Sequence, residues 1–249
     1  MATEAHPSSA AAWEGRIDLE AQALGCSTAA RAAAAGSSDG THPQQQKQQQ
    51  LFGLVVQAVQ QVSAADAVQL WETGFTLAES LAAAGSTAQL VALQKQLLSA
   101  VTAASVRGPE TGGLGAVAGR CLDVLWRASG AAAARKLWQR LLLLPPAGGD
   151  MFRAMVQLEQ SAADAAVADA SDPQQRRQFA AEGAKRLRGV YEAWAAAYGG
   201  VDAELWVEWA LFEQQQGKAG AGNLYWRAVK ALDTPEDFIA AYRQQIGAA

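Results

Sequence analysis

The chain has 249 residues, of which 50% are hydrophobic, and its formal net charge at pH 7 is −4 with a pI near 5.3. That balance excludes a globally basic protein of the kind that binds nucleic acid through its overall charge. Alanine supplies much of the hydrophobic content and strand-forming residues are few, so the composition predicts an all-α fold. The two cysteines, Cys26 and Cys121, stand far apart, which favours a reducing compartment. No apolar run approaches the roughly 18–20 residues that a bilayer-spanning helix needs.

Residues 1–50 are expected to be a low-complexity, largely disordered segment with one short helix. Apolar side chains recur at helical spacing over residues 10–24. Residues 27–50 then pass through Ala, Gly and Ser into a glutamine tract broken only by Lys47. This stretch offers little apolar surface to bury, so we expect it to be flexible.

From Leu51 onward, helices with an apolar stripe alternate with short breaks rich in Gly, Pro and Asp. Residues 51–249 are therefore predicted to form one helical-repeat domain. The predicted helices span residues 51–62, 67–84, 88–105, 114–127, 131–144, 150–162, 173–198, 203–216, 221–232 and 235–246.

Two repeated patterns indicate how these helices are organised. Residues at offsets 0, +3 and +7, which share one helix face, recur 54 residues apart as Phe152, Met155, Glu159 and as Trp206, Trp209, Glu213. A second pattern aligns Trp138, Tyr191 and Tyr225 at intervals of 53 and 34 residues. The shorter interval is the period of a two-helix tetratricopeptide-like unit, and an insertion or loop near residues 161–173 would account for most of the excess in the longer one. The spacing predicts antiparallel helix pairs stacked as a solenoid.

These residues carry a family resemblance. The first-helix residues Trp206, Trp209 and Glu213, with the second-helix run from Tyr225 through Trp226 and Arg227 to Ala228, resemble half-a-tetratricopeptide (HAT) repeats. More narrowly, about residues 184–242 resemble the C-terminal part of the U3 small nucleolar RNA-associated protein 6 family.

The resemblance implies a function and a location. Members of that family are HAT-repeat subunits of the UTP-B subcomplex of the small-subunit processome. We therefore expect the chain to be a non-catalytic scaffold in ribosome small-subunit biogenesis. Its expected location is the nucleus, within the nucleolus. Its partners would be protein subunits of a large ribonucleoprotein assembly, including β-propeller proteins, with U3 snoRNA and pre-rRNA contacted indirectly. The alternatives are a HAT-repeat protein of mRNA 3′-end processing, splicing or organellar RNA maturation, and a repeat protein that binds RNA directly.

The residues of the repeat patterns are interpreted as repeat core. A bulky side chain such as Trp206 can pack above a small one such as Ala228 in the neighbouring helix. The alternative is that Trp206, Trp209 and Trp226 stack on bases. Glu213 and Glu159 have two interpretations: they pair with Arg227, Arg188 or a neighbouring arginine inside the repeat, or they lie on an ordinary solvated helix face. The full set is Trp138, Phe152, Met155, Tyr191, Trp206, Trp209, Glu213, Tyr225, Trp226, Arg227 and Ala228.

One basic cluster is a candidate patch for RNA or an acidic partner, against the alternative of an ordinary charged helix face. It comprises Arg176, Arg177, Lys185, Arg186 and Arg188. A smaller group, Arg135, Lys136 and Arg140, has the same two interpretations. Catalytic, cofactor and metal sites are not expected, because the only histidines are His6 and His42 and no nucleotide-binding motif occurs.

Overall fold

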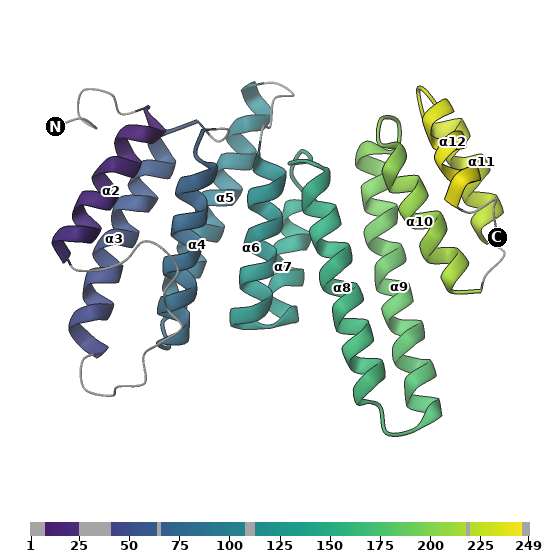
Figure 1. Cartoon of the computed structure of the whole chain (residues 1–249), viewed down its shortest axis with the longest axis horizontal. Coiled ribbons are helices and arrows are strands. Elements are labelled where there is room, and N and C mark those ends of the chain that lie inside the picture. The colour runs from purple at the N-terminus through teal and green to yellow at the C-terminus, as the bar shows by residue number, and fades with distance from the viewer. Residues whose placement is uncertain (1–7, 25–40, 64–65, 108–112, 218–219, 246–249) are drawn as a thin grey trace. The chain divides into compact units, whose positions relative to one another are not determined.

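The computed structural model describes residues 8–24, 41–63, 66–107, 113–217 and 220–245 of the chain (Figure 1). Every regular element in these ranges is an α-helix, so the all-α prediction is confirmed for them. Cys26, His6 and residues 27–40 of the segment expected to be flexible lie outside the described residues.

The chain divides into two compact units, residues 1–154 (unit 1) and residues 155–249 (unit 2), and the division falls inside helix α8 (Gly149–Asp169). The sequence analysis places a boundary at residue 50 instead. In the structure, helix α2 (Ala10–Leu24) packs against helix α3 (Thr41–Gln61), and its Trp13 and Ile17 are buried. Residues 10–24 therefore belong to unit 1.

The glutamine tract forms the first part of α3, so the prediction of a flexible segment is wrong for residues 41–50. Glutamine has a helix propensity close to that of the best helix formers, and the buried Leu51 and Val55 anchor the rest of the helix. Gln48 Nε2 also donates a hydrogen bond of 3.0 Å to Ser80 Oγ in the next helix. A tract with little apolar surface is thus ordered as the extension of a helix that is anchored elsewhere.

The remaining helices of unit 1 pack against their neighbours in the chain, and α6 also contacts α4. Helix α4 contributes the large buried side chains Trp71 and Phe75 to the core. Gly130, with φ of +83°, joins α6 to α7 in a backbone conformation that glycine adopts most easily. The bounds are α4 (Val68–Ala83), α5 (Ala88–Arg107), α6 (Leu114–Ser129) and α7 (Ala131–Leu141).

Unit 2 contains the rest of α8 and four further helices, α9 (Pro173–Tyr198), α10 (Ala203–Gln215), α11 (Gly220–Ala231) and α12 (Glu236–Gln245). Helix α10 packs against α9, α11 and α12. Helices α8 and α9 run antiparallel as a long hairpin (Figure 1).

Residues 161–173 are mostly helical, with residues 170–172 connecting α8 to α9. Residues 161–169 continue α8, and the Asp172 side chain caps α9 by accepting a 2.8 Å hydrogen bond from the Gln175 backbone N–H. Gly183 of α9 lies so close to Ala163 of α8 that a Cβ at Gly183 would stand 2.5 Å from the Ala163 Cβ. The Ala-rich stretch provides the small side chains that this close contact with α9 requires, and it is ordered as part of α8.

Candidate functional site

Two buried carboxylates of unit 2, one in α8 and one in α10, are bound by arginines of α9, the helix between them. Glu159 of α8 is 2% exposed and Glu213 of α10 is 6% exposed. Arg186 Nε donates to Glu159 Oε2 at 3.1 Å, and Arg188 Nη2 donates to Glu213 Oε2 at 2.8 Å while its Nε donates to Oε1. Residues two apart on a helix point to nearly opposite sides, so α9 reaches α8 with one arginine and α10 with the other. Of the two interpretations of Glu159 and Glu213, these contacts agree with pairing to nearby arginines and not with a solvated helix face.

The Arg188–Glu213 contact is a bidentate, charge-assisted pair. The hydrogen bonds to Glu213 raise the pKa of Arg188, and this effect outweighs desolvation, which lowers it. Such paired contacts fix orientation as well as charge, because both guanidinium N–H groups must meet the plane of the carboxylate. The pair therefore sets the position of α10 along α9.

Aromatic rings of α9 and α10 form a stack that is covered by an arginine. Tyr191 lies 5.8 Å from Trp209 with the ring planes 7° apart, and Trp209 lies 5.7 Å from Trp206 with the planes 15° apart. The Arg227 guanidinium of α11 stands 5.0 Å from the Trp209 ring centroid and 5.5 Å from that of Trp206. Trp206 Nε1 donates to the Gly199 carbonyl at 2.9 Å. These rings are buried and contact protein on their faces, which fits packing rather than base stacking.

Arg227 also connects α11 back to α9. Its Nη1 donates to Glu192 Oε1 at 2.8 Å, and its Nη2 donates to Glu192 Oε2. The hydrogen bonds from Arg227 lower the pKa of Glu192, against the smaller opposing effect of desolvation. Both side chains are about half exposed, so this pair lies at the rim of the aromatic stack rather than inside it.

The second-helix residues of the repeat pattern divide between core and surface. Ala228 is fully buried, and Tyr225 is half-buried in a cluster with Phe238 and Tyr242 of α12. Trp226 is 71% exposed, which corrects the prediction that it belongs to the repeat core. Trp226 stands two positions before the buried Ala228, and two positions along a helix correspond to a rotation of about 200°. Its side chain therefore lies on the side of α11 opposite the buried one.

The upstream copy of the pattern is buried as well. In unit 1, Trp138 of α7 meets Phe152 of α8 edge to face, with ring centroids 5.2 Å apart and planes at 87°. Met155, the first residue of unit 2, is buried too. The predicted core role of Trp138, Phe152 and Met155 agrees with this burial.

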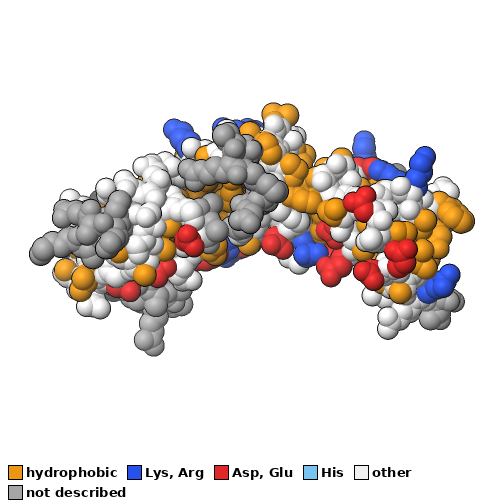
Figure 2. All heavy atoms as spheres, turned by 90° about the horizontal axis from the view of Figure 1, so that it is seen from above, with side chains coloured by type: hydrophobic (Ala, Val, Ile, Leu, Met, Phe, Trp, Pro, Cys, Tyr) orange, Lys and Arg blue, Asp and Glu red, His pale blue; other side chains and the backbone are white. Residues whose placement is uncertain are grey.

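The five cationic residues predicted as a patch do not form one. Arg186 and Arg188 are turned toward buried carboxylates of two different helices, and Arg176 Nε donates to the Ala170 carbonyl beside the α8–α9 turn. Of these five, Arg177 and Lys185 are the exposed cations whose side chains contact no charged or polar group of the described residues. On the face drawn in Figure 2, acidic and basic side chains are interspersed over the C-terminal part of the chain, which gives no continuous basic field.

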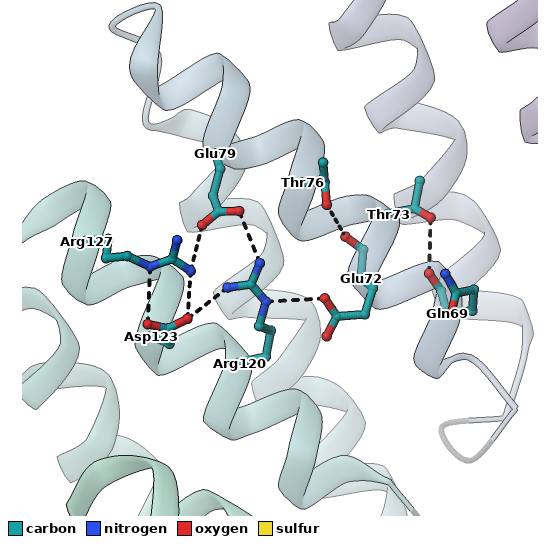
Figure 3. A network of polar contacts seen from close by, with 8 residues as sticks. All are labelled: Gln69, Glu72, Thr73, Thr76, Glu79, Arg120, Asp123 and Arg127. Carbon is teal, nitrogen blue, oxygen red and sulfur yellow. Dashed lines mark hydrogen bonds and ion pairs between the residues drawn. The ribbon is translucent and has the colours of Figure 1, made fainter. Parts of the chain in front are cut away.

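Unit 1 contains an ion network that the sequence analysis missed (Figure 3). Arg120 of α6 contacts Glu72 and Glu79 of α4 at 3.2 Å each and Asp123 at 2.8 Å, and Arg127 contacts Glu79 at 2.9 Å. Burial of Arg120 lowers its pKa, but the charges of Glu79 and Glu72 together with hydrogen bonds outweigh this and raise it. The sequence signal was present: Glu72 and Glu79 stand seven apart, as do Arg120 and Arg127, so each pair occupies one helix face.

Comparisons with known proteins identify no relative. No protein-family model, no curated protein and no solved structure matches the chain. Among the described residues, no group of three or more His, Cys, Asp and Glu side chains is arranged to hold a metal ion. The helices of the described ranges include none with the length and apolar character needed to cross a membrane.

Proposed function

We propose that this chain is a non-catalytic HAT-like helical-repeat scaffold that acts through protein–protein contacts in ribosome small-subunit biogenesis. One observation carries the scaffold part of the proposal: Glu159 and Glu213 occupy equivalent positions 54 residues apart and are both buried against arginines of α9. The two contacts run in opposite directions along the chain, because α9 follows the helix of Glu159 and precedes that of Glu213. A carboxylate that recurs at the same place in the helix pattern and is buried both times is nevertheless what a repeated helix pair produces.

The packing of the aromatics supports the same proposal. The stack formed by Tyr191, Trp209 and Trp206 is enclosed by neighbouring helices and by Arg227. A helix array that is stabilised by its own repeated contacts keeps its outer faces available, and its rigid stacking would fix the relative positions of larger subunits. The assignment to the small-subunit processome rests on the resemblance of about residues 184–242 to the U3 small nucleolar RNA-associated protein 6 family.

Affinity purification of the tagged full chain with mass spectrometry tests this function. We expect nucleolar β-propeller proteins to be recovered together with U3 snoRNA. As a matched control, the Trp206→Ala variant should lose these partners because its helix packing is disrupted, whereas Arg177→Ala should keep them. Recovery of splicing or mRNA 3′-end-processing factors alone would transfer the chain to another class of HAT-repeat proteins.

Direct RNA binding is the second candidate function, and the exposure of Trp226 favours it. An exposed indole can stack on a base, which contributes about 1–3 kcal/mol per base in single-strand binding. Filter binding of the purified chain to pre-rRNA at several salt concentrations tests it. Affinity that falls steeply with salt and is reduced by Trp226→Ala would support direct binding, because phosphate neutralisation releases counterions. Affinity that is absent at low salt would exclude it.

A further inference from the structure

Helix α7 lies in a stretch of the chain that carries only positive charge. Residues 124–149 contain Arg127, Arg135, Lys136 and Arg140 and no Asp or Glu. Arg127 is paired with Asp123 and Glu79, and Arg135 stands 5.1 Å from the Trp126 ring centroid. Lys136 and Arg140 are exposed, and neither has a recorded contact with a charged or polar group of the described residues. Their charges are therefore available to a partner.

One exposed leucine, in the turn after α7, follows these cations on the same side of the helix. Leu143 stands seven positions after Lys136 and three after Arg140, a spacing that keeps all three on one face. Leu143 is 86% exposed and Leu142 is 40% exposed. The opposite side of α7, with Ala134, Leu137, Trp138 and Leu141, is buried in unit 1.

The leucines are held in a defined turn rather than on a loose end. The Leu142 backbone N–H donates to the Trp138 carbonyl at 3.0 Å, and the Leu143 and Leu144 N–H groups donate to the Arg140 and Leu141 carbonyls at 3.3 and 3.0 Å. The turn is thus a tightened continuation of α7. Covering the exposed apolar area of Leu143 with a partner's side chain would be favourable, and the ordered backbone holds this leucine in place for such a contact.

We propose that the outer face of α7 and of the turn after it, made by Lys136, Arg140 and Leu143, binds an acidic segment of a partner protein that also carries an aliphatic side chain. The charges determine the acidic character of the segment, because Lys136 and Arg140 have no counterion within the described part of the chain. Leu143 determines the aliphatic part, because carboxylates alone would leave its apolar area in water. The inference rests on the proposed function in one respect, that the chain binds proteins.

A protein segment fits this face better than the other polyanions. Nucleic acid phosphates would neutralise Lys136 and Arg140 but would leave Leu143 uncovered. An anionic membrane would accept both the cations and the leucines. Two cations are few for membrane binding, which gains only about 1 kcal/mol per basic residue near an anionic surface. A peptide that places two carboxylates and one leucine at helical spacing satisfies every exposed group on the face.

Fluorescence anisotropy with the purified full chain tests the proposal directly. The probe is a labelled helical peptide with glutamates and leucines on one face, compared with versions in which Gln replaces Glu or Ser replaces Leu. We expect the first peptide to bind and both altered peptides to bind more weakly. In the chain, Lys136→Glu with Arg140→Glu should weaken binding about tenfold or more, and Leu143→Ser should weaken it several-fold.

Matched substitutions elsewhere in unit 1 control for general changes in charge and hydrophobicity. Lys95→Glu removes an exposed cation of α5, and Leu19→Ser removes an exposed leucine of α2. Neither should change the affinity, and unaltered circular dichroism will show that all variants fold. Peptide binding that is undetectable at low salt, or that is equally reduced by the two control variants, would overturn the proposal.

The same assay separates the alternative ligands. Polyuridylate and phosphatidylserine-containing vesicles serve as probes for nucleic acid and membrane, and tighter binding of either through Lys136 and Arg140, with no effect of Leu143→Ser, would also overturn the proposal. A failure of the proposed α7 surface can be distinguished from a failure of the proposed scaffold function. Recovery of nucleolar propeller proteins that the Lys136→Glu, Arg140→Glu variant leaves unchanged would retain that function and reject this surface.

Discussion

Arg188 of α9 donates two hydrogen bonds to the carboxylate of Glu213 in α10, and this carboxylate is almost completely buried. Two positions earlier, Arg186 binds the equivalent carboxylate Glu159 of α8. Hydrophobic packing alone permits helices to slide or rotate past each other, whereas a buried carboxylate has to meet its arginine. The two pairs therefore specify which helices become the neighbours of α9 and in what register.

The first prediction concerns the stability of this arrangement. Arg188→Met should destabilise unit 2 by about 3 kcal/mol, because it leaves the Glu213 charge buried without its partner. Adding Glu213→Met should recover much of that loss, since an apolar pair can replace a buried ion pair. Urea unfolding followed by circular dichroism measures both effects, with the exposed Arg177→Met as the control. Equal losses in the single and double variants would show that the unpaired Glu213 carboxylate is not the source of the loss.

The second prediction concerns the contact between α8 and α9. Gly183→Ala should lower the free energy of unfolding, because the new Cβ would lie 2.5 Å from the Ala163 Cβ and the helices would have to separate. Gly189→Ala, in the same helix, has no atom within 4 Å of the added Cβ and should raise stability by up to about 1 kcal/mol through helix propensity. Thermal unfolding of the two variants gives the comparison. The idea fails if both alanines shift the midpoint in the same direction.

The third prediction compares the buried Trp206 with the exposed Trp226. Trp206→Phe should destabilise α10 by about 1–3 kcal/mol, because the hydrogen bond to Gly199 is lost and the buried stack with Trp209 is repacked. Trp226→Phe should change stability by less than about 0.5 kcal/mol, since that side chain is mostly in water. Hydrogen exchange of peptides from α10 and α11 provides the measurement. Similar losses of protection in both variants would contradict the assignment of Trp226 to the surface.

The sequence predicted the existence of the helices well, and it predicted their ends where the signals are local. The bounds of α9 agree with the prediction because Asp172 and Pro173 form a local cap. The start of α3 and the end of α8 were missed by several residues. Both extensions depend on contacts with other helices, at Gln48 and at Gly183, and a local pattern does not contain such contacts.

For the candidate site too, the sequence predicted which residues share a helix face but not which helices they contact. Periodicity places Trp206, Trp209 and Glu213 on one face, and the structure buries all three. Periodicity could not show that Arg186 and Arg188 are bound to separate buried acids, because that depends on which helices flank α9. For the same reason the sequence did not decide whether the cationic cluster, or the smaller group on α7, is a binding patch or an ordinary charged face.

The fourth prediction follows from the pair at the rim of the aromatic stack. Because Arg227 lowers the pKa of Glu192 in the folded state, this pair stabilises the fold above the ordinary pKa range of glutamate. The contribution should disappear as the pH falls through the lowered folded-state pKa. Both groups are half exposed, so it amounts to at most about 1 kcal/mol. The stability difference between the native chain and Glu192→Gln, measured by urea unfolding from neutral pH to about pH 3, should therefore shrink on acidification. A difference that grows would refute this assignment.

The fifth prediction concerns the ion network of unit 1. Arg120→Met removes the group that joins Glu72 and Glu79 of α4 to Asp123 of α6, and leaves Arg127 as the only cation among these three carboxylates in the described contacts. We expect a loss of about 1–2 kcal/mol, because the groups are partly exposed but act as a network. Arg120→Lys should recover only part of it, since one ammonium cannot meet three carboxylates in the fixed geometry of a guanidinium.

Salt and hydrogen exchange make this last prediction specific. High NaCl should reduce the difference between the native chain and Arg120→Met, because the network is screened where it is exposed. Faster exchange should be confined to α4 and α6, which the network joins. Lys95→Met removes an exposed cation of α5 without a recorded partner in the described residues, so it provides the control. If Arg120→Met behaves like Lys95→Met, the network contributes nothing to the packing of α4 on α6, and their apolar contacts alone hold the two helices together.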